Sequence, residues 1–213
     1  MSNLSTPPRT EQLRKEAYGE RWSLTFVDRL GVWLSGHKIR RTIKDFSQLR
    51  IADIGCGYQA MFARTVLDKV QSAVLADVSL SPELKAHPKV RALEGYLPSV
   101  LAAIESESQD LVMCISVLEH VRDPLATLKE FRRILAPGGT CLLSVPTWRG
   151  KWFLEFSAFR LKTSPPEEMD DHKMYYDLRD FWPLLVQAGF LPHQIRCCRY
   201  KFGIGLFTVC KLL

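Results

Sequence analysis

The segment Ile51-Ala-Asp-Ile-Gly-Cys-Gly-Tyr-Gln-Ala60 decides the fold of this chain. An apolar, strand-like run enters a turn that holds Gly55 and Gly57, and a helix-like segment follows. Glycines let the backbone approach a ligand closely. A second apolar run, Ala73-Val-Leu-Ala76, ends on Asp77, and an acid at this strand tip suits the hydroxyl groups of a ribose. Together the two signals predict an adenosine-containing cofactor.

The size and charge of the chain set limits on its function. Its 213 residues suit one α/β domain with additions better than two full domains. The net charge of +6 favours anionic substrates, membrane surfaces or nucleic acid without choosing among them. A solvated basic surface explains this charge equally well.

The six cysteines form no Cys-x-x-Cys pair, so the sequence predicts neither a zinc site nor thioredoxin-like chemistry, and no bound metal. Three of them lie in apolar runs and are expected to behave as small hydrophobes: Cys114, Cys141 and Cys210. The N-terminus does not resemble a signal peptide, and no apolar run approaches the roughly 18 residues that span a bilayer. A cytoplasmic location is therefore expected.

Strand-like and helix-like runs alternate from residue 50 onward. The predicted strands are 50–54, 73–78, 89–93, 110–116, 139–145, 190–199 and 203–212, and the predicted helices are 58–69, 97–105, 124–135 and 177–188. This alternation predicts an α/β fold with a seven-stranded, mostly parallel sheet and helices on both faces. The last two strands should pair antiparallel, because a parallel pair needs a crossover of about a dozen residues.

Residues 1–46 are expected to form an N-terminal tail and helical cap, and residues 47–213 the main domain. Gly31 and Gly36 should divide the helical stretch 10–46 into two helices. Residues 147–176, rich in aromatic and basic side chains, exceed the usual connection of about two to six residues. This insertion is a candidate lid or substrate-binding segment.

The glycine-rich turn formally matches the dinucleotide fingerprint G-x-G-x-x-G/A. However, Asp53 would lie where a dinucleotide places its pyrophosphate, and like charges repel. The same carboxylate suits a cationic ammonium group. An NAD(P)-dependent oxidoreductase remains an alternative, although the chain has no obvious Tyr-x-x-x-Lys pair.

Two further segments, Ser116-Val-Leu-Glu-His-Val-Arg-Asp-Pro124 and Leu135-Ala-Pro-Gly-Gly139, complete the pattern. As a set, these motifs resemble the class I S-adenosylmethionine-dependent methyltransferases, in particular the type 11 subgroup that includes the ubiquinone/menaquinone methyltransferases. The resemblance covers roughly residues 40–200 and implies a Rossmann-like fold, S-adenosylmethionine as cofactor and methyl transfer as the reaction. A non-catalytic S-adenosylmethionine-binding module is the other alternative.

The resemblance also implies which residues bind the cofactor. They are Asp53, Gly55, Cys56, Gly57, Asp77, Val78, Glu94, Tyr96, Ser116, Val117 and His120. Asp53, Gly55 and Gly57 would line the methionine end, Asp77 would bind the ribose, and residues 116–120 would close over the cofactor. The family's adenine-binding turn falls on Glu94-Gly95-Tyr96, which departs from the usual Gly-Asp-Ala-like pattern, so the adenine contact stays open.

Methyl transfer from a sulfonium needs a general base only when the acceptor is a weakly acidic hydroxyl or a protonated amine. His172 and His120 are the candidate catalytic residues, with Asp170 and Asp171 as alternatives. The insertion's aromatic and basic mixture suits a small-molecule or lipid-linked acceptor, such as a lipid-linked saccharide. An interfacial helix at 148–162 would allow peripheral membrane contact. Dispersed basic residues and the absence of a known module argue against nucleic acid.

Overall fold

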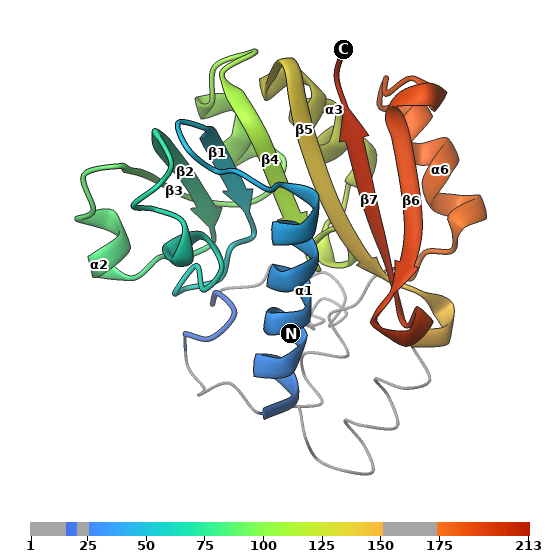
Figure 1. Ribbon diagram of the computed structural model, residues 1–213, viewed down its shortest axis with the longest axis horizontal. Helices are drawn as coiled ribbons and strands as arrows, with labels where there is room; N and C mark the ends of the chain where they lie inside the picture. Colours follow the sequence, from blue (N-terminus) through green and yellow to red (C-terminus); the bar gives the residue numbers. More distant parts are fainter. Residues whose placement is uncertain (1–15, 21–25, 151–173) are drawn as a thin grey trace, which may run out of the picture.

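The computed structural model describes residues 16–20, 26–150 and 174–213 (Figure 1). Its centre is a seven-stranded sheet in the order β3-β2-β1-β4-β5-β7-β6. The strands are β1 (Arg50–Ile54), β2 (Ser72–Asp77), β3 (Val90–Glu94), β4 (Gln109–Ile115), β5 (Leu135–Pro146), β6 (Ile195–Tyr200) and β7 (Gly205–Lys211). β7 pairs antiparallel with β5 and β6, whereas the other neighbours are parallel. The predicted α/β sheet with a terminal antiparallel hairpin is confirmed.

The central strands are mostly apolar and buried because helices and turns cover both faces of the sheet. In β1, Ala52 and Ile54 face one hydrophobic cluster, and Ile51 faces the other. The predicted strand cysteines Cys114, Cys141 and Cys210 are all buried.

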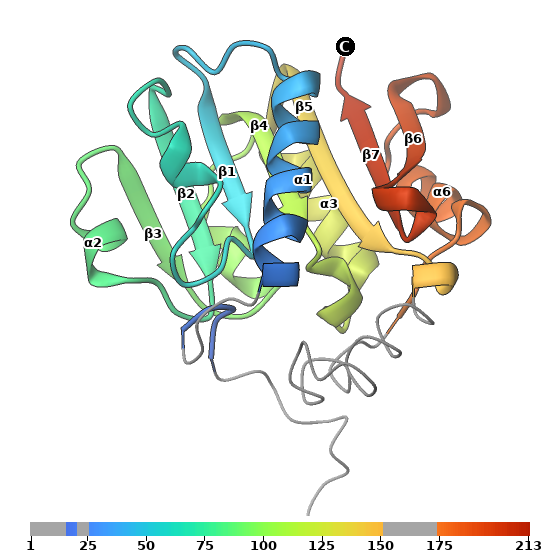
Figure 2. The same cartoon turned by 60° about the horizontal axis from the view of Figure 1, so that its bottom comes forward.

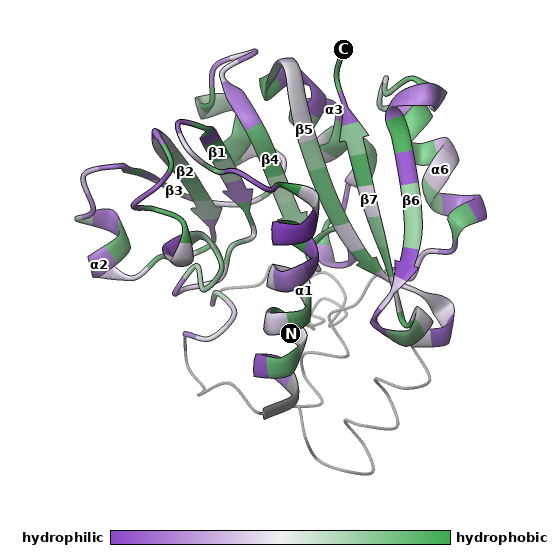
Figure 3. Cartoon of the chain, viewed as in Figure 1, coloured by the Kyte–Doolittle hydropathy of each residue, from purple (hydrophilic) through white to green (hydrophobic). Residues whose placement is uncertain are grey.

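The helices lie on opposite faces of this sheet (Figure 2). α3 (Pro124–Ile134) and α6 (Leu178–Gln187) pack into the first cluster, and α1 (Phe26–Thr42) packs into the second through Ile39. α2 (Pro82–Lys85) is a single short turn beside β3. Figure 3 shows apolar colouring along the central strands and hydrophilic colouring in the C-terminal half of α1.

The predicted helix 124–135 is confirmed as α3, with a cap at its start. The Asp123 carboxylate accepts a hydrogen bond from the backbone N–H of Ala126 at 2.8 Å, and Pro124 occupies the first helical position. Leu128, Phe131 and Ile134 are fully buried. The helix passes directly into β5 at Leu135. The segment 137–139 therefore lies inside a strand that begins earlier than the predicted 139–145, past an irregularity in its register with β4.

Two predicted helices are wrong. Residues 58–69 contain only the 3-10 turn Ala63–Thr65, because Ala60 adopts a left-handed φ of 42° and Tyr58 bonds elsewhere through its backbone. Its N–H donates to the Tyr18 carbonyl, and its carbonyl accepts from the N–H of Ser81. Residues 97–105 likewise hold only a 3-10 turn, Ser99–Ala103.

Two predicted boundaries also need correction. Gly31 and Gly36 do not divide the N-terminal helix, because a glycine costs a helix only about 1 kcal/mol. A β-carbon at Gly36 would lie 3.2 Å from the Phe62 ring, so the missing side chain lets α1 approach the sheet's covering segment. β6 starts at Ile195 rather than at residue 190, since Pro192–Gln194 forms a 3-10 turn.

Within the described ranges, none of the helices is long and apolar enough to cross a bilayer. Residues 1–15, 21–25 and 151–173 lie outside the described residues. The division into a cap and a main domain, and the predicted lid, therefore stay predictions.

The Asp110 side chain joins the starts of β1 and β4. It accepts three hydrogen bonds from Arg50, at 2.8 Å from the backbone N–H and at 3.0 and 2.7 Å from the guanidinium. Because the pair is about one-third exposed, we expect Asp110→Ala to lower the free energy of unfolding by only about 1–2 kcal/mol. Denaturant titration measures this loss. Glu83→Ala removes a more exposed ion pair with Arg64, and an equal loss there would contradict the assignment.

Candidate functional site

Three carboxylates lie at one edge of the sheet, where β1, β2 and β3 end. Asp53 is the penultimate residue of β1, and Asp77 and Glu94 are the last residues of β2 and β3. Asp77 and Glu94 are register partners, and Ile54, beside Asp53, pairs with Ala76, beside Asp77. The carboxyl ends of parallel strands are where open α/β sheets bind ligands.

The glycine-rich turn folds back onto the end of β2. The Gly55 N–H donates to the Ala76 carbonyl at 2.7 Å. One oxygen of Asp77 accepts from the Gly57 N–H at 2.7 Å, and the other accepts from the Val78 N–H at 2.7 Å. Asp77, the last residue of β2, therefore holds the glycine-rich turn against the end of its strand.

The segment after β4 presses against this turn. A β-carbon at Gly55, whose φ is +71°, would lie 2.2 Å from the Val117 Cγ2 atom. Ser116 adopts a left-handed φ of 57°, and its N–H donates to the Ser144 carbonyl at 2.9 Å. The structure thus brings together the two loops that carry most of the predicted cofactor-binding residues.

Residues 16–20 form a third part of the site, which sequence reasoning did not find. The Tyr18 carbonyl accepts from the Tyr58 N–H at 2.9 Å and lies 3.1 Å from where a Gly57 β-carbon would be. The Glu20 carboxylate accepts from the Ser79 hydroxyl at 2.6 Å. These contacts hold the segment over the glycine turn. One contact uses backbone atoms and the other pairs common polar side chains, so no sequence motif predicts them.

Burial makes this edge of the sheet electrostatically unusual. Asp53 is only 6% exposed, and its burial, together with the nearby charge of Asp77, raises its pKa to about 7. Burial, reinforced by the same two carboxylates, also raises the pKa of the Cys56 thiol well above its usual range. A cationic group placed here would relieve the repulsion, whereas a phosphate would increase it.

Glu94 has partners of its own. Its Oε1 atom lies 2.7 Å from the Lys85 ammonium and accepts from the Leu80 N–H at 2.8 Å. The hydrogen bond from Lys85 is the main reason that the pKa of Glu94 is lowered. Tyr96, the other predicted adenine residue, is 41% exposed. The structure places both at the correct edge of the sheet but gives Glu94 a structural task.

Glu119 is a second buried acid, on the 3-10 turn Leu118–His120 after β4. It is 2% exposed, and burial raises its pKa to about 7, opposed by the charge of His120. Among the described residues, its Oε2 atom and the hydroxyl of buried Tyr176 have no hydrogen-bond partner. Burial raises the pKa of Tyr176, and the nearby charge of Glu119 raises it further.

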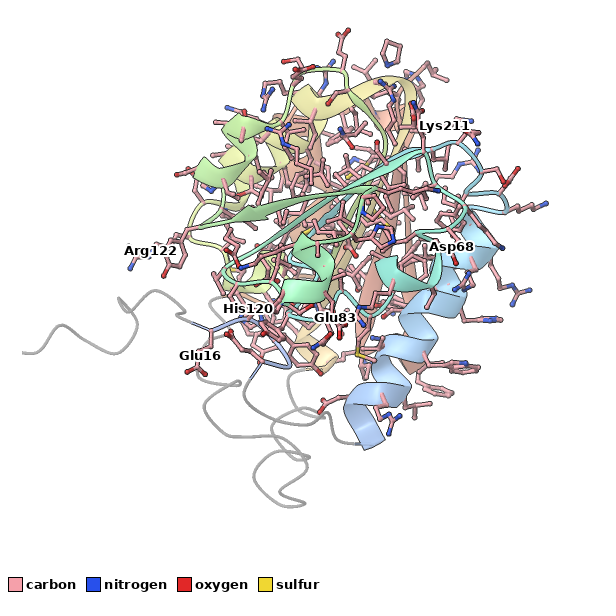
Figure 4. All side chains as sticks on the ribbon, turned by 90° about the vertical axis from the view of Figure 1, so that its left-hand side faces the viewer. Glu16, Asp68, Glu83, His120, Arg122 and Lys211 are labelled. Atoms are coloured by element: carbon pink, nitrogen blue, oxygen red, sulfur yellow. The ribbon has the colours of Figure 1, made fainter. Side chains whose placement is uncertain are left out.

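Of the predicted catalytic residues, the structure describes only His120. His120 lies at the same end of the molecule as Glu16, opposite Lys211 (Figure 4). His172, Asp170 and Asp171 lie outside the described residues, so their roles remain predictions. The described part of the chain holds no group of three or more His, Cys, Asp or Glu side chains that could bind a metal ion.

Comparison with known proteins agrees with this geometry. Residues 24–195 match a family model described as a methyltransferase domain. A ubiquinone biosynthesis O-methyltransferase of Xanthomonas campestris is 36% identical over 103 residues, covering 45% of this chain and 42% of that protein. The protein of the same name from Dinoroseobacter shibae is 32% identical over 155 residues, covering 69% and 62%. The chain thus matches less than half the length of the Xanthomonas relative.

Solved structures share the fold. An S-adenosylmethionine-dependent methyltransferase from Archaeoglobus fulgidus superposes with a TM-score of 0.59 at 14% identity, covering 84% of this chain and 93% of the other. One from Mesorhizobium loti gives 0.57 at 14% identity, covering 82% and 96%. At such low identity the similarity establishes the fold alone, including its Rossmann-like sheet.

The raised pKa of Asp53 makes the stability of the ligand-free protein depend on pH. Its usual value is 3.8 and its folded value about 7, so the folded protein holds an extra proton between these limits and loses stability as pH rises through them. Glu119 contributes in the same direction. Asp53→Asn should reduce this loss by roughly 2–3 kcal/mol between about pH 5 and pH 8. Denaturant titration at both pH values measures it, and an unchanged loss in the variant would refute the assignment.

Substitution of two glycines separates the effect of the Val117 contact from the effect of left-handed backbone geometry. Gly55 and Gly138 both have left-handed φ, of +71° and +77°, but Gly138 has no atom within 4 Å of its β-carbon position. Gly138→Ala should cost about 1 kcal/mol, whereas Gly55→Ala should cost about 2 kcal/mol more because Val117 must move. Equal losses of unfolding free energy would show that the loops do not touch as described.

Proposed function

Because the chain belongs to the methyltransferase domain family, we propose that it transfers a methyl group from S-adenosylmethionine to a small-molecule or lipid-linked acceptor. One observation carries the proposal: two carboxylates, Asp53 and Asp77, stand at neighbouring strand ends around a glycine turn, and one of them is buried with a raised pKa. This arrangement suits a ligand with a cationic amino-acid end and a ribose.

The described residues fit such a ligand. Asp53 would pair with the ammonium of the methionine portion, which would lower its pKa and remove the cost of its burial. Asp77, which is held by the Gly57 and Val78 N–H groups, would accept hydrogen bonds from the ribose hydroxyls. The bound cofactor supplies an electrophilic methyl group, and the protein's main task is to align the acceptor with it.

The same two carboxylates disfavour the alternative function, an NAD(P)-dependent oxidoreductase. A pyrophosphate at the glycine turn would lie beside Asp53 and Asp77 and would oppose their charge. Glu119 and Tyr176 would have no evident role in hydride transfer.

Glu119 adds a candidate base that the sequence interpretation did not select. A carboxylate whose pKa lies near 7 is suited to accept a proton from an acceptor hydroxyl. The relatives named ubiquinone biosynthesis O-methyltransferases act, by that name, on oxygen. We therefore favour a hydroxyl acceptor, with Glu119 and His120 on the side of the site formed by the end of β4. His172 remains a second predicted base.

Calorimetry tests the cofactor. S-adenosylhomocysteine should bind and NADH should not, and Asp77→Asn should weaken binding by about 1–3 kcal/mol because ribose hydroxyls lose an acceptor. Glu83→Gln is the control, since Glu83 is an exposed acid on α2 whose partner is Arg64. NADH binding, or equal effects of the two substitutions, would reject the proposal.

Turnover tests the base. With methyl-labelled donor and a panel of phenolic and lipid-linked hydroxyl acceptors, wild-type rates should rise with pH to a plateau above about pH 7. Glu119→Gln should lower the rate about 10²-fold or more and abolish that rise, while S-adenosylhomocysteine affinity stays unchanged. An unaltered pH profile in the variant would exclude Glu119 as the base.

A further inference from the structure

Three large apolar side chains are exposed on α1 and on the turn between β6 and β7. Trp33 is 62% exposed and Leu30 44% exposed on α1, and Phe202 is 101% exposed on the turn between β6 and β7. Single exposed apolar residues are ordinary, whereas a cluster of them marks an interaction surface.

These side chains belong to one region. Leu30 and Trp33 are three residues apart in α1 and therefore share a face of the helix. The Lys201 ammonium lies 3.8 Å from the position that a β-carbon would occupy at Gly31, so the β6–β7 turn adjoins the same half of α1. Figure 2 shows this turn and α1 on the same face of the sheet.

The backbone of this turn is strained. Lys201 and Phe202 both adopt left-handed φ values, 49° and 56°, at positions where short hairpin turns usually carry asparagine or glycine. Phe202 places a fully exposed aromatic ring at the tip of the hairpin. Strained residues of this kind gather at functional sites.

Basic side chains surround the apolar ones. Arg29 and Arg41 are exposed on α1, and Lys201 stands on the turn. The ring of His37 stacks on that of Trp33, with their centroids 5.7 Å apart. Asp28, the acid of this helix, is only partly exposed. The surface is therefore apolar at its centre and positive around it.

We propose that this surface docks the protein on an anionic phospholipid bilayer. Trp33, Leu30 and Phe202 enter the headgroup region, where an amphipathic indole ring is favoured, while the basic residues face the lipid phosphates. The chain's net charge of +6 adds a longer-range attraction to such a surface.

Other occupants fit the same residues less well. A symmetric pair of chains would bring the arginines of one copy against those of the other. Single-stranded nucleic acid stacks its bases on aromatic rings, and the aliphatic Leu30 offers none. The docking surface also adjoins the carboxyl edge of the sheet. The Thr147 hydroxyl, just after β5, donates to the Gly203 carbonyl at 2.9 Å, so a lipid-borne acceptor would meet the protein beside its site.

Vesicle co-sedimentation of the full chain tests the proposal. Wild-type protein should bind vesicles of phosphatidylcholine and phosphatidylglycerol, and more weakly those of phosphatidylcholine alone. Trp33→Ser/Phe202→Ser should reduce binding by about tenfold or more, because two apolar anchors are lost. Leu191→Ser is the matched control, since Leu191 is 52% exposed on the link that follows α6. It should bind like wild type.

A second pair of variants separates this surface from overall charge. Arg29→Gln/Arg41→Gln should weaken binding to the anionic vesicles several-fold, whereas Lys129→Gln/Arg179→Gln, which removes two exposed charges from α3 and α6 on the opposite face, should not. Equal losses in both pairs, no vesicle binding by wild type, or a dimer that Trp33→Ser/Phe202→Ser dissociates would overturn the proposal. S-adenosylhomocysteine calorimetry on the same samples tests the cofactor site independently.

Discussion

The burial of one carboxyl group, Asp53, beside a second acid, Asp77, at adjacent strand ends is the constraint around which the site is organised. Parallel pairing of β1 with β2 fixes Asp53 and Asp77 in place, so neither can move away without breaking the sheet. Asp77 is stabilised by two backbone N–H groups, whereas Asp53 is buried and keeps its proton up to about pH 7. A cationic ligand group placed at these strand ends would pair with the Asp53 carboxylate and offset the cost of its burial.

Close backbone approach is the second requirement, and it links several loops. Gly55 has no side chain because Val117 occupies that space, and the carbonyl of Tyr18 lies directly against Gly57. Three chain segments that are distant in sequence therefore converge on one turn. Any ligand of the turn would contact residues from all three, which makes the site sensitive to the position of residues 16–20.

Strands and capped helices were predictable because their signals are local. The apolar runs gave five of the strands nearly their correct ends, and the helix predicted from residue 124 begins there as α3. Helix 58–69 failed because Tyr58 bonds through its backbone to Tyr18 and Ser81, which no local pattern reveals. The supposed break at Gly31 and Gly36 failed because α1 packs closely over Phe62, where a glycine is an advantage.

The sequence alone was enough to establish the α/β class, the glycine-rich turn and the acids at the strand ends. Each of these depends on residues that are near one another in the sequence. Only the folded chain decided that Asp53 would be buried beside Asp77, that Glu94 would be held by Lys85, and that Glu119 would lie buried without a partner near Tyr176. Burial and charge proximity arise from segments brought together by packing. Burial changes the pKa of a carboxyl group by removing water, and a nearby charge changes it directly. Neither effect can be read from the residues that are adjacent in the sequence.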